Sequence, residues 1–187
     1  MLATVTALAR ENCKMQGLKI HAVSVAEGIL AITRLPGGEG DYASDIAGLS
    51  EWRPGLVISM TTQAEMAEAG AGDLGLDVQS SGSRWVHLPI ADFGTPPADV
   101  EAQWAAVSKS ALAALRGGGK VLVHCRGGCG RSGMIALRLM IEAGEAADLA
   151  LERLRGVRAC AVETDEQMAW AKSGRKAKKA AKGDRPE

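Results

Sequence analysis

The feature that most constrains the fold of this 187-residue chain is the run from Lys120 to about residue 143. It begins with a short, almost continuously apolar segment, KVLVH (120–124), which is typical of a central strand covered on both faces. A glycine-rich loop, CRGGCGRSG (125–133), follows at once, and an amphipathic helix is predicted over about 132–143. Strand, loop and helix in this order favour an anion-binding cradle, because loop amides and the positive end of the helix dipole point to one place.

The rest of the chain predicts helices alternating with buried strands. Strands are expected over 19–25, 28–33, 55–60 and 84–88. Helices are expected from Asp41 to about Trp52, in a short segment after Thr62 that contains Glu65, from 97 or 98 to 115, and over about 145–156 and 164–173. The passage from Gly70 to Gly82 is expected to be rich in loops. This pattern predicts an α/β fold with a central, mainly parallel or mixed sheet flanked by helices.

Composition excludes several classes of protein. With 47% hydrophobic and 24% charged residues, the chain is typical of a globular protein rather than a disordered one. No run approaches the roughly 18 apolar residues of a membrane span. The N-terminal stretch is interrupted by Thr4, Thr6 and Arg10, which makes it a poor secretory signal. We therefore expect a cytoplasmic protein that does not partner a membrane.

The net charge of zero hides a basic C-terminus. Residues 172–187 carry seven Lys and Arg against two Asp and Glu, so they hold +5 and the preceding 171 residues hold −5. We expect a single domain over 1–171 and a basic, flexible tail over 172–187. The tail is interpreted as a solvated terminus, because an acidic body argues against dedicated nucleic-acid binding. The oligomeric state is left open.

Four cysteines stand at positions 13, 125, 129 and 160. They form no Cys-x2-Cys pair, so a structural zinc site is not expected, and no other metal or cofactor is indicated. In a cytoplasmic protein most thiols stay reduced. Cys13 and Cys160 are therefore expected to be packing or surface residues, whereas the pair within the loop differs in kind.

The loop residues suit covalent phosphoryl transfer. Cys125 would lie at the base of a positively polarised bowl, which favours the nucleophilic thiolate. Arg131 offers a planar fork for two phosphate oxygens, and Ser132 can stabilise the sulfur of Cys125 as a leaving group. His124, on the strand, could orient the loop and tune the thiol of Cys125. The residues whose backbone or side chains would surround the phosphate are Arg126, Gly127, Gly128, Cys129, Gly130 and Arg131.

Phosphate-ester cleavage also needs an acid to protonate the leaving oxygen. The candidate is Asp92, in the loop that follows the expected strand 84–88. Active-site loops of parallel α/β sheets gather at the carboxyl ends of the strands. From spacing alone, Asp92 is as compatible with a turn cap as with an acid.

The sequence resembles a known family. HCRGGCGRS matches the His-Cys-x5-Arg-Ser signature of the cysteine-dependent protein phosphatases, of the tyrosine and dual-specificity superfamily. HLPIADFGTP and LPGG are similar to segments of the cyclin-dependent-kinase-associated phosphatases, and the resemblance spans about residues 29–170. It implies the cysteine-phosphatase fold, no metal and a phosphocysteine intermediate. It also implies that Cys125 is the nucleophile, Arg131 the phosphate clamp, Ser132 the stabiliser of the leaving thiolate and Asp92 the general acid.

Three positions depart from the family pattern. Cys129 is either a small wall residue of the loop or a second thiol able to trap oxidised Cys125 in a disulfide. In VETDEQ (162–167), Gln167 matches a family glutamine, but Glu163 stands where glutamine is usual and its role is open. Phe93 replaces a small residue after the acid, where it narrows the mouth of the site or packs within its loop.

These residues favour an enzyme that hydrolyses phosphate monoesters on Tyr, Ser or Thr side chains, with a phosphoprotein of unidentified sequence as its partner. A shallow, dual-specificity-like site is favoured, because aromatic residues make up only 3% of the chain. Two alternatives stay open: a phosphatase of lipid, inositol or RNA 5′ phosphates, and a phosphate-binding module without turnover.

Overall fold

Five strands form the centre of the molecule, in the order β1-β2-β5-β3-β4. The computed structural model describes residues 17–174. The strands are β1 (His21–Val25), β2 (Gly28–Arg34), β3 (Leu56–Ser59), β4 (Arg84–His87) and β5 (Lys120–Cys125). β1 is antiparallel to β2, whereas the other three neighbouring pairs are parallel. The predicted mixed, mainly parallel sheet is confirmed, with β5 at its middle.

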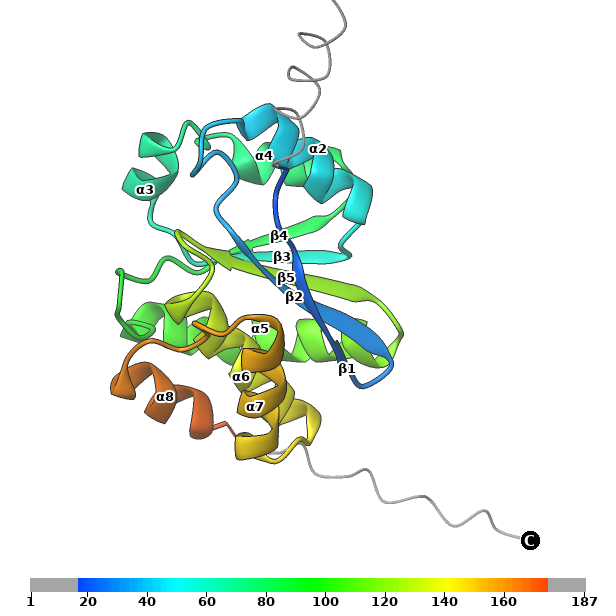
Figure 1. Ribbon diagram of the computed structural model, residues 1–187, viewed down its shortest axis with the longest axis vertical. Coiled ribbons are helices and arrows are strands. Elements are labelled where there is room, and N and C mark those ends of the chain that lie inside the picture. The colour runs from blue at the N-terminus through cyan, green and yellow to red at the C-terminus, as the bar shows by residue number, and fades with distance from the viewer. Residues whose placement is uncertain (1–16, 175–187) are drawn as a thin grey trace, which may run out of the picture.

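Helices cover both faces of this sheet, as Figure 1 shows. Among the described residues, one face carries α2 (Tyr42–Trp52), α3 (Gln63–Glu68) and α4 (Leu74–Ser80). The other face carries α5 (Ala98–Arg116), α6 (Gly130–Ala143), α7 (Ala147–Val157) and α8 (Asp165–Lys172). On β5, Leu122 belongs to the hydrophobic cluster under the first group, and Val121 and Val123 belong to the cluster under the second. The near-continuous apolar run of β5 thus reflects burial on both faces.

Two of the predicted helix starts are confirmed by their caps. Asp41 accepts a hydrogen bond from the Ser44 N–H at the start of α2. Thr62 and Glu65 form a reciprocal capping box at the start of α3, which satisfies two backbone N–H groups that have no partner within the helix.

The passage from Gly70 to Gly82 corrects one prediction, because it contains helix α4. Glycines at 70, 72, 75 and 82 lower the helix propensity of this stretch. Leu74 and Val78, four residues apart, are both buried against the sheet. Packing of this short apolar stripe therefore outweighs the low helix propensity of the passage.

The chain ends lie largely beyond the described residues. Cys13 and the N-terminal segment, for which predictions were made, lie outside the described residues, as do residues 175–187 of the predicted tail. Lys172, assigned to that tail from sequence, is the last residue of α8, and its Nζ lies 2.9 Å from Asp148 Oδ1. Within residues 17–174, no helix is long and apolar enough to cross a membrane.

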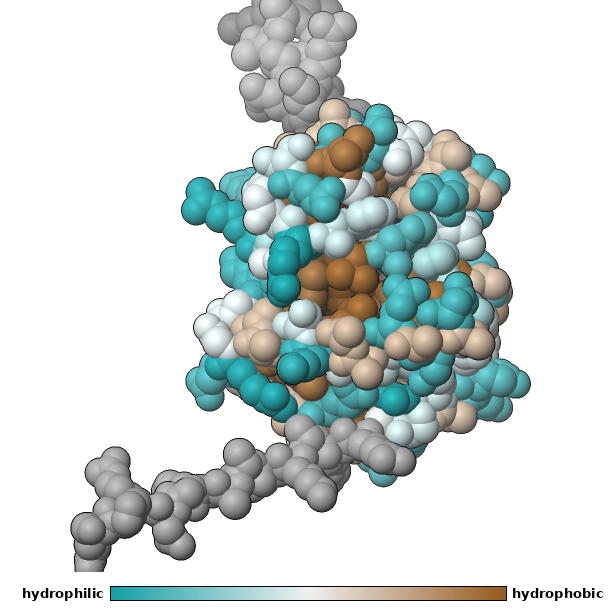
Figure 2. Space-filling view, turned by 180° about the vertical axis from the view of Figure 1, so that it is seen from behind, coloured by the Kyte–Doolittle hydropathy of each residue, from teal (hydrophilic) through white to brown (hydrophobic). Residues whose placement is uncertain are grey.

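Seen from behind, hydrophobic side chains gather in a hollow between the two helical layers (Figure 2). A cavity of about 450 Å³ lies along β4 between α4 and α5, with Leu56, Trp85 and Val107 among its lining residues. It is separate from the carboxyl end of β5, where the glycine-rich loop begins.

Candidate active site

The glycine-rich loop joins β5 directly to α6. Cys125 is the last residue of β5, and Gly130 is the first residue of α6. Arg34, at the end of β2, pairs in register with Cys125, and Ser59, at the end of β3, pairs with His124. The carboxyl ends of three parallel strands therefore meet where the loop starts, which is where α/β folds place their sites.

Cys125 lies at the floor of this region. It is 3% exposed and is a free thiol. Its Sγ lies 3.3 Å from Ser132 Oγ, on the first turn of α6. The structure thus brings together the two groups to which the sequence assigned the nucleophile and the support of its sulfur.

Arg131 is buried although it carries a charge, with 1% of its surface exposed. Its Nη1 and Nη2 each donate to a carboxylate oxygen of Glu65 at 2.8 Å, and Nη1 also donates to the Ile90 carbonyl at 2.9 Å. Nη2 lies 2.8 Å from Asp92 Oδ1. The Nε donor has no partner among the described protein groups, although buried donors are almost always satisfied.

Glu65 is the residue that sequence reasoning missed. Burial raises the pKa of its carboxyl, but hydrogen bonds from Arg131 and Thr62 outweigh burial and lower the pKa to about 2. From the sequence, Glu65 was expected only to lie within the short helix after Thr62. The same carboxylate also fixes the guanidinium of Arg131, 66 residues further along the chain.

Asp92 lies beside Arg131, as the strand-end argument predicted. Its side chain is about half exposed, at 51%. Phe93 follows it with φ +57° and 60% exposure, so its ring points into solvent from a backbone conformation that favours glycine. The carboxylate of Asp92 is therefore accessible to a ligand that approaches the loop.

His124 supports the loop from beneath. It is fully buried, and burial lowers its pKa to about 4, so the imidazole is neutral at pH 7. Its Nε2 lies 2.5 Å from Ser59 Oγ, which also accepts a hydrogen bond from Trp85 Nε1 at 2.7 Å. The predicted orienting residue is thus tied to neighbouring strands rather than to the thiol.

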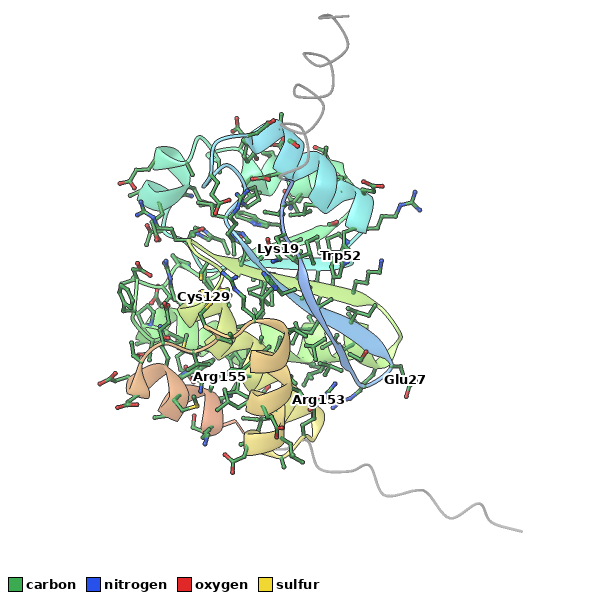
Figure 3. The ribbon with its side chains drawn as sticks, viewed as in Figure 1. Lys19, Glu27, Trp52, Cys129, Arg153 and Arg155 are labelled. Carbon is green, nitrogen blue, oxygen red and sulfur yellow. A yellow bond between two sulfur atoms is a disulfide. The ribbon has the colours of Figure 1, made fainter. Side chains whose placement is uncertain are left out.

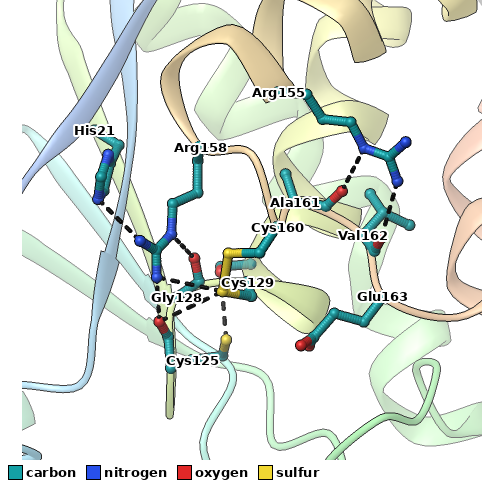
Figure 4. Close-up of a disulfide and its surroundings, with 12 residues drawn as sticks. His21, Cys125, Gly128, Cys129, Arg155, Arg158, Cys160, Ala161, Val162 and Glu163 are labelled. Atoms are coloured by element: carbon teal, nitrogen blue, oxygen red, sulfur yellow. Dashed lines mark hydrogen bonds between the residues drawn. A yellow bond between two sulfur atoms is a disulfide. The ribbon is translucent and has the colours of Figure 1, made fainter.

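The loop backbone needs glycine at one position in particular. Gly128 has φ +71°, and a Cβ there would meet the Thr33 carbonyl group at 2.7 Å. Arg158, just after α7, donates from Nε to the Gly128 carbonyl at 2.9 Å and from Nη2 to the Gly127 carbonyl at 2.8 Å (Figure 4). Two loop carbonyls thus point toward Arg158. This leaves the neighbouring amides free for an anion.

Arg126 is the loop's other cation. Its side chain is exposed, and Nη1 lies 3.4 Å from Glu68 Oε2. A cavity of about 330 Å³ lies beside the loop here. Its lining residues are Arg34, Leu35, Gly37, Gly38, Glu39, Glu65, Glu68, Ala69, Arg126 and Gly127.

Gln167 joins two loops near the site. It is fully buried, its Nε2 donates to the Gly94 carbonyl at 3.2 Å, and its Oε1 accepts from the Glu163 N–H at 3.1 Å. A Cβ on Gly130 would meet Glu163 and Gln167 side-chain atoms within 3 Å. Both residues of VETDEQ therefore pack against the start of α6.

Cys129 and Cys160 correct two predictions, because they form a disulfide. Cys129 lies at the start of α6 (Figure 3). Cys129 is therefore not a free residue in the wall of the loop, and its disulfide partner is not Cys125. Cys160 is likewise not a free packing or surface thiol. The two loops that carry them adjoin only in the folded chain, across 31 residues of sequence, and no local pattern indicates that contact.

The fold and this loop define a cysteine-based phosphatase of the dual-specificity and tyrosine class. The family model described as "Tc-R-P: Polymorphic toxin system, DSP-PTPase phosphatase" matches residues 35–145, more than half of the chain. The chain belongs to this family, and it is a phosphatase enzyme. The comparison with curated proteins gave no match.

Solved structures of other proteins share this fold. Kinase associated phosphatase, with its catalytic cysteine replaced by serine, superposes with a TM-score of 0.75 and 24% identity, over 84% of this chain and 94% of that chain. Tk-PTP in its active form gives 0.61 and 28%, over 77% and 89%. PTPMT1 in complex with PI(5)P gives 0.62 and 16%, over 82% and 93%.

Proposed function

We propose that this enzyme hydrolyses phosphate monoesters on Tyr, Ser or Thr side chains of proteins, through a phosphocysteine at Cys125. The observation that carries the proposal is the state of Arg131. Its guanidinium is buried and fixed by Glu65 at the loop that starts with Cys125, and its Nε donor has no protein partner. A phosphate oxygen is the acceptor that suits such a donor.

Each step of the reaction has a residue for it. Sγ of Cys125 attacks phosphorus, the bond from phosphorus to the ester oxygen breaks, and protonated Asp92 gives its proton to that oxygen. Asp92, now ionised, takes a proton from water as the water oxygen attacks the phosphocysteine. The P–S bond breaks, phosphate leaves, and Ser132 Oγ, 3.3 Å away, donates to the sulfur as it becomes a thiolate.

The charge around the loop favours substrates with one phosphate. The two cations that line the adjoining cavity, Arg34 and Arg126, are already paired with carboxylates, Arg34 with Glu39 and Asp45 and Arg126 with Glu68. Groups bearing several phosphates, as in inositol lipids or RNA ends, would find no unpaired cation among these lining residues. None of the lining residues is aromatic, which supports a shallow site that accepts short as well as long phosphorylated side chains.

The test compares wild type with Cys125→Ser on para-nitrophenyl phosphate, in EDTA, with and without reductant. We expect turnover only in wild type, and we expect both proteins to bind tungstate, because the loop amides and Arg131 survive. Equal turnover in the variant would contradict the mechanism, and tungstate binding without turnover in wild type would favour a phosphate-binding module.

Substrate class is tested with the same two proteins. Phosphotyrosine and phosphothreonine peptides are compared with vesicles containing a phosphatidylinositol monophosphate and with RNA bearing a 5′ phosphate. We expect kcat/KM to be highest on a peptide, and faster release of phosphate from the lipid or the RNA would overturn the protein assignment.

A further inference from the structure

The disulfide between Cys129 and Cys160 ties the glycine-rich loop (125–133), called the phosphate loop below, to the segment between α7 and α8. The two Cα atoms are 5.2 Å apart. Figure 4 shows the bond beside the loop, with Arg158 next to it. Cys160 is exposed and Cys129 is partly exposed, so a reductant can reach the bond. The reaction of a phosphatase does not use this pair.

We propose that Cys129 and Cys160 form a redox site that exchanges with a dithiol reductant and sets the affinity of the phosphate loop for phosphate. The disulfide form holds the loop in its binding shape, and the dithiol form releases it. The exchange itself is independent of the proposed function, whereas any change in turnover rests on it.

The surroundings of the two sulfurs set the direction of exchange. A thiolate of the reductant attacks Sγ of Cys160, the more exposed residue of the pair, the Cys129–Cys160 bond breaks, and Cys129 leaves as a thiolate. Arg158 Nη2 lies 3.3 Å from the Cys129 sulfur, and a neighbouring cation stabilises a thiolate leaving group. The second thiol of the reductant then attacks the mixed disulfide, which frees Cys160. The reductant is oxidised to its own disulfide, and two electrons reduce the protein.

The loop is held from the same side by other bonds. Arg158 binds the Gly127 and Gly128 carbonyls, and the Val162 N–H donates to the Cys129 carbonyl at 3.4 Å. Reduction removes the covalent link and places a thiolate beside Arg158, where it competes with those carbonyls for the guanidinium. Because each peptide unit is planar, a carbonyl that turns away from Arg158 also turns the next amide away from the bound anion.

The experiment uses the Cys125→Ser protein, so that oxidation of the nucleophile cannot contribute. Tungstate affinity is measured by calorimetry in the oxidised protein, after dithiothreitol, and in the Cys125→Ser/Cys160→Ser variant. We expect tungstate to bind at least about fivefold more weakly to the reduced protein, a size typical of coupling between two sites. The double variant should bind tungstate as weakly as the reduced protein, and dithiothreitol should not change its affinity.

Mass spectrometry after alkylation checks the site itself. We expect Cys129 and Cys160 to be blocked before reduction and alkylated together after it. By linkage, saturating tungstate should shift the equilibrium toward the disulfide by the same factor. If the double variant does not fold, the oxidised and reduced Cys125→Ser protein still give the comparison.

Two results would overturn the proposal: free thiols at both positions in the oxidised protein, or tungstate affinities equal within twofold in the two redox states. Failure of the proposed function is read separately, from the turnover of wild type on para-nitrophenyl phosphate. A redox-dependent tungstate affinity in a protein without turnover would leave the redox site standing and remove the phosphatase mechanism.

Discussion

Glu65 holds the buried guanidinium of Arg131, and the Glu65→Gln variant measures how much that contact stabilises the protein. The carboxylate accepts two hydrogen bonds from Arg131 and one from the Thr62 N–H, each 2.8 Å long, and its side chain is 11% exposed. Glutamine keeps the shape, but it removes the charge and turns an N–H group toward Arg131. The variant therefore leaves the buried guanidinium with only the half-exposed Asp92 as a charged partner.

The pKa of Glu65 gives the magnitude. Its folded value is about 2 against an ordinary value of 4.5, and each unit corresponds to about 1.4 kcal/mol. The ionised carboxylate thus stabilises the fold by about 3 kcal/mol, as an order of magnitude. Because the folded pKa is lowered, this stability is present above pH 4.5 and is lost as the pH falls toward 2. Breaking a buried pair costs a similar amount, about 3–5 kcal/mol.

The assay is urea unfolding of wild type and Glu65→Gln at pH 7, 5.5, 4 and 3. We expect a difference of about 3 kcal/mol at pH 7 that narrows below pH 4.5. Glu68→Gln, on the same helix, is the control, since its exposed pair with Arg126 should contribute at most about 1 kcal/mol. A loss that is equal at pH 7 and pH 3, or no larger than that of Glu68→Gln, would refute the reasoning.

Three further predictions follow from the site. Asp92→Asn should slow esters with poor leaving groups most, and an equal effect across a series of aryl phosphates would remove Asp92 from the acid role. In wild type, the free energy of unfolding in urea should fall by about 1.4 kcal/mol per pH unit between pH 6.5 and 4, because His124 takes up a proton in the unfolded chain but not in its buried position in the fold. The His124→Asn variant should lack this pH dependence. Since Phe93 has φ +57°, Phe93→Gly should be about 1 kcal/mol more stable to urea than Phe93→Ala, and equal stabilities would show that this backbone conformation carries no strain.

Elements with a strong local signal could be predicted from the sequence. β5 is apolar throughout because both of its faces are buried, and the caps at Asp41 and Thr62 mark where α2 and α3 begin. Helix α4 has no such signal, since Gly75 and the glycines that flank the helix obscure a stripe of only two buried residues. The helix forms because these two residues pack against the sheet. Since the sheet is assembled from strands far apart in the sequence, the local sequence does not reveal this packing.

The residues of the site likewise divide into those that the local sequence predicts and those that it does not. Cys125 and Ser132 are seven residues apart across one turn of loop, so the signature itself dictates their meeting. The contacts of Glu65 and Cys160 with the loop bridge 66 and 31 residues, and a single sequence gives no sign of which distant residues will touch. Glu65 also has a local role, because it forms the capping box at the start of α3 with Thr62. One oxygen of its carboxylate serves both the Thr62 N–H and Arg131. The cap that starts α3 therefore also positions Arg131, and a change to Thr62 or to Arg131 should disturb both contacts.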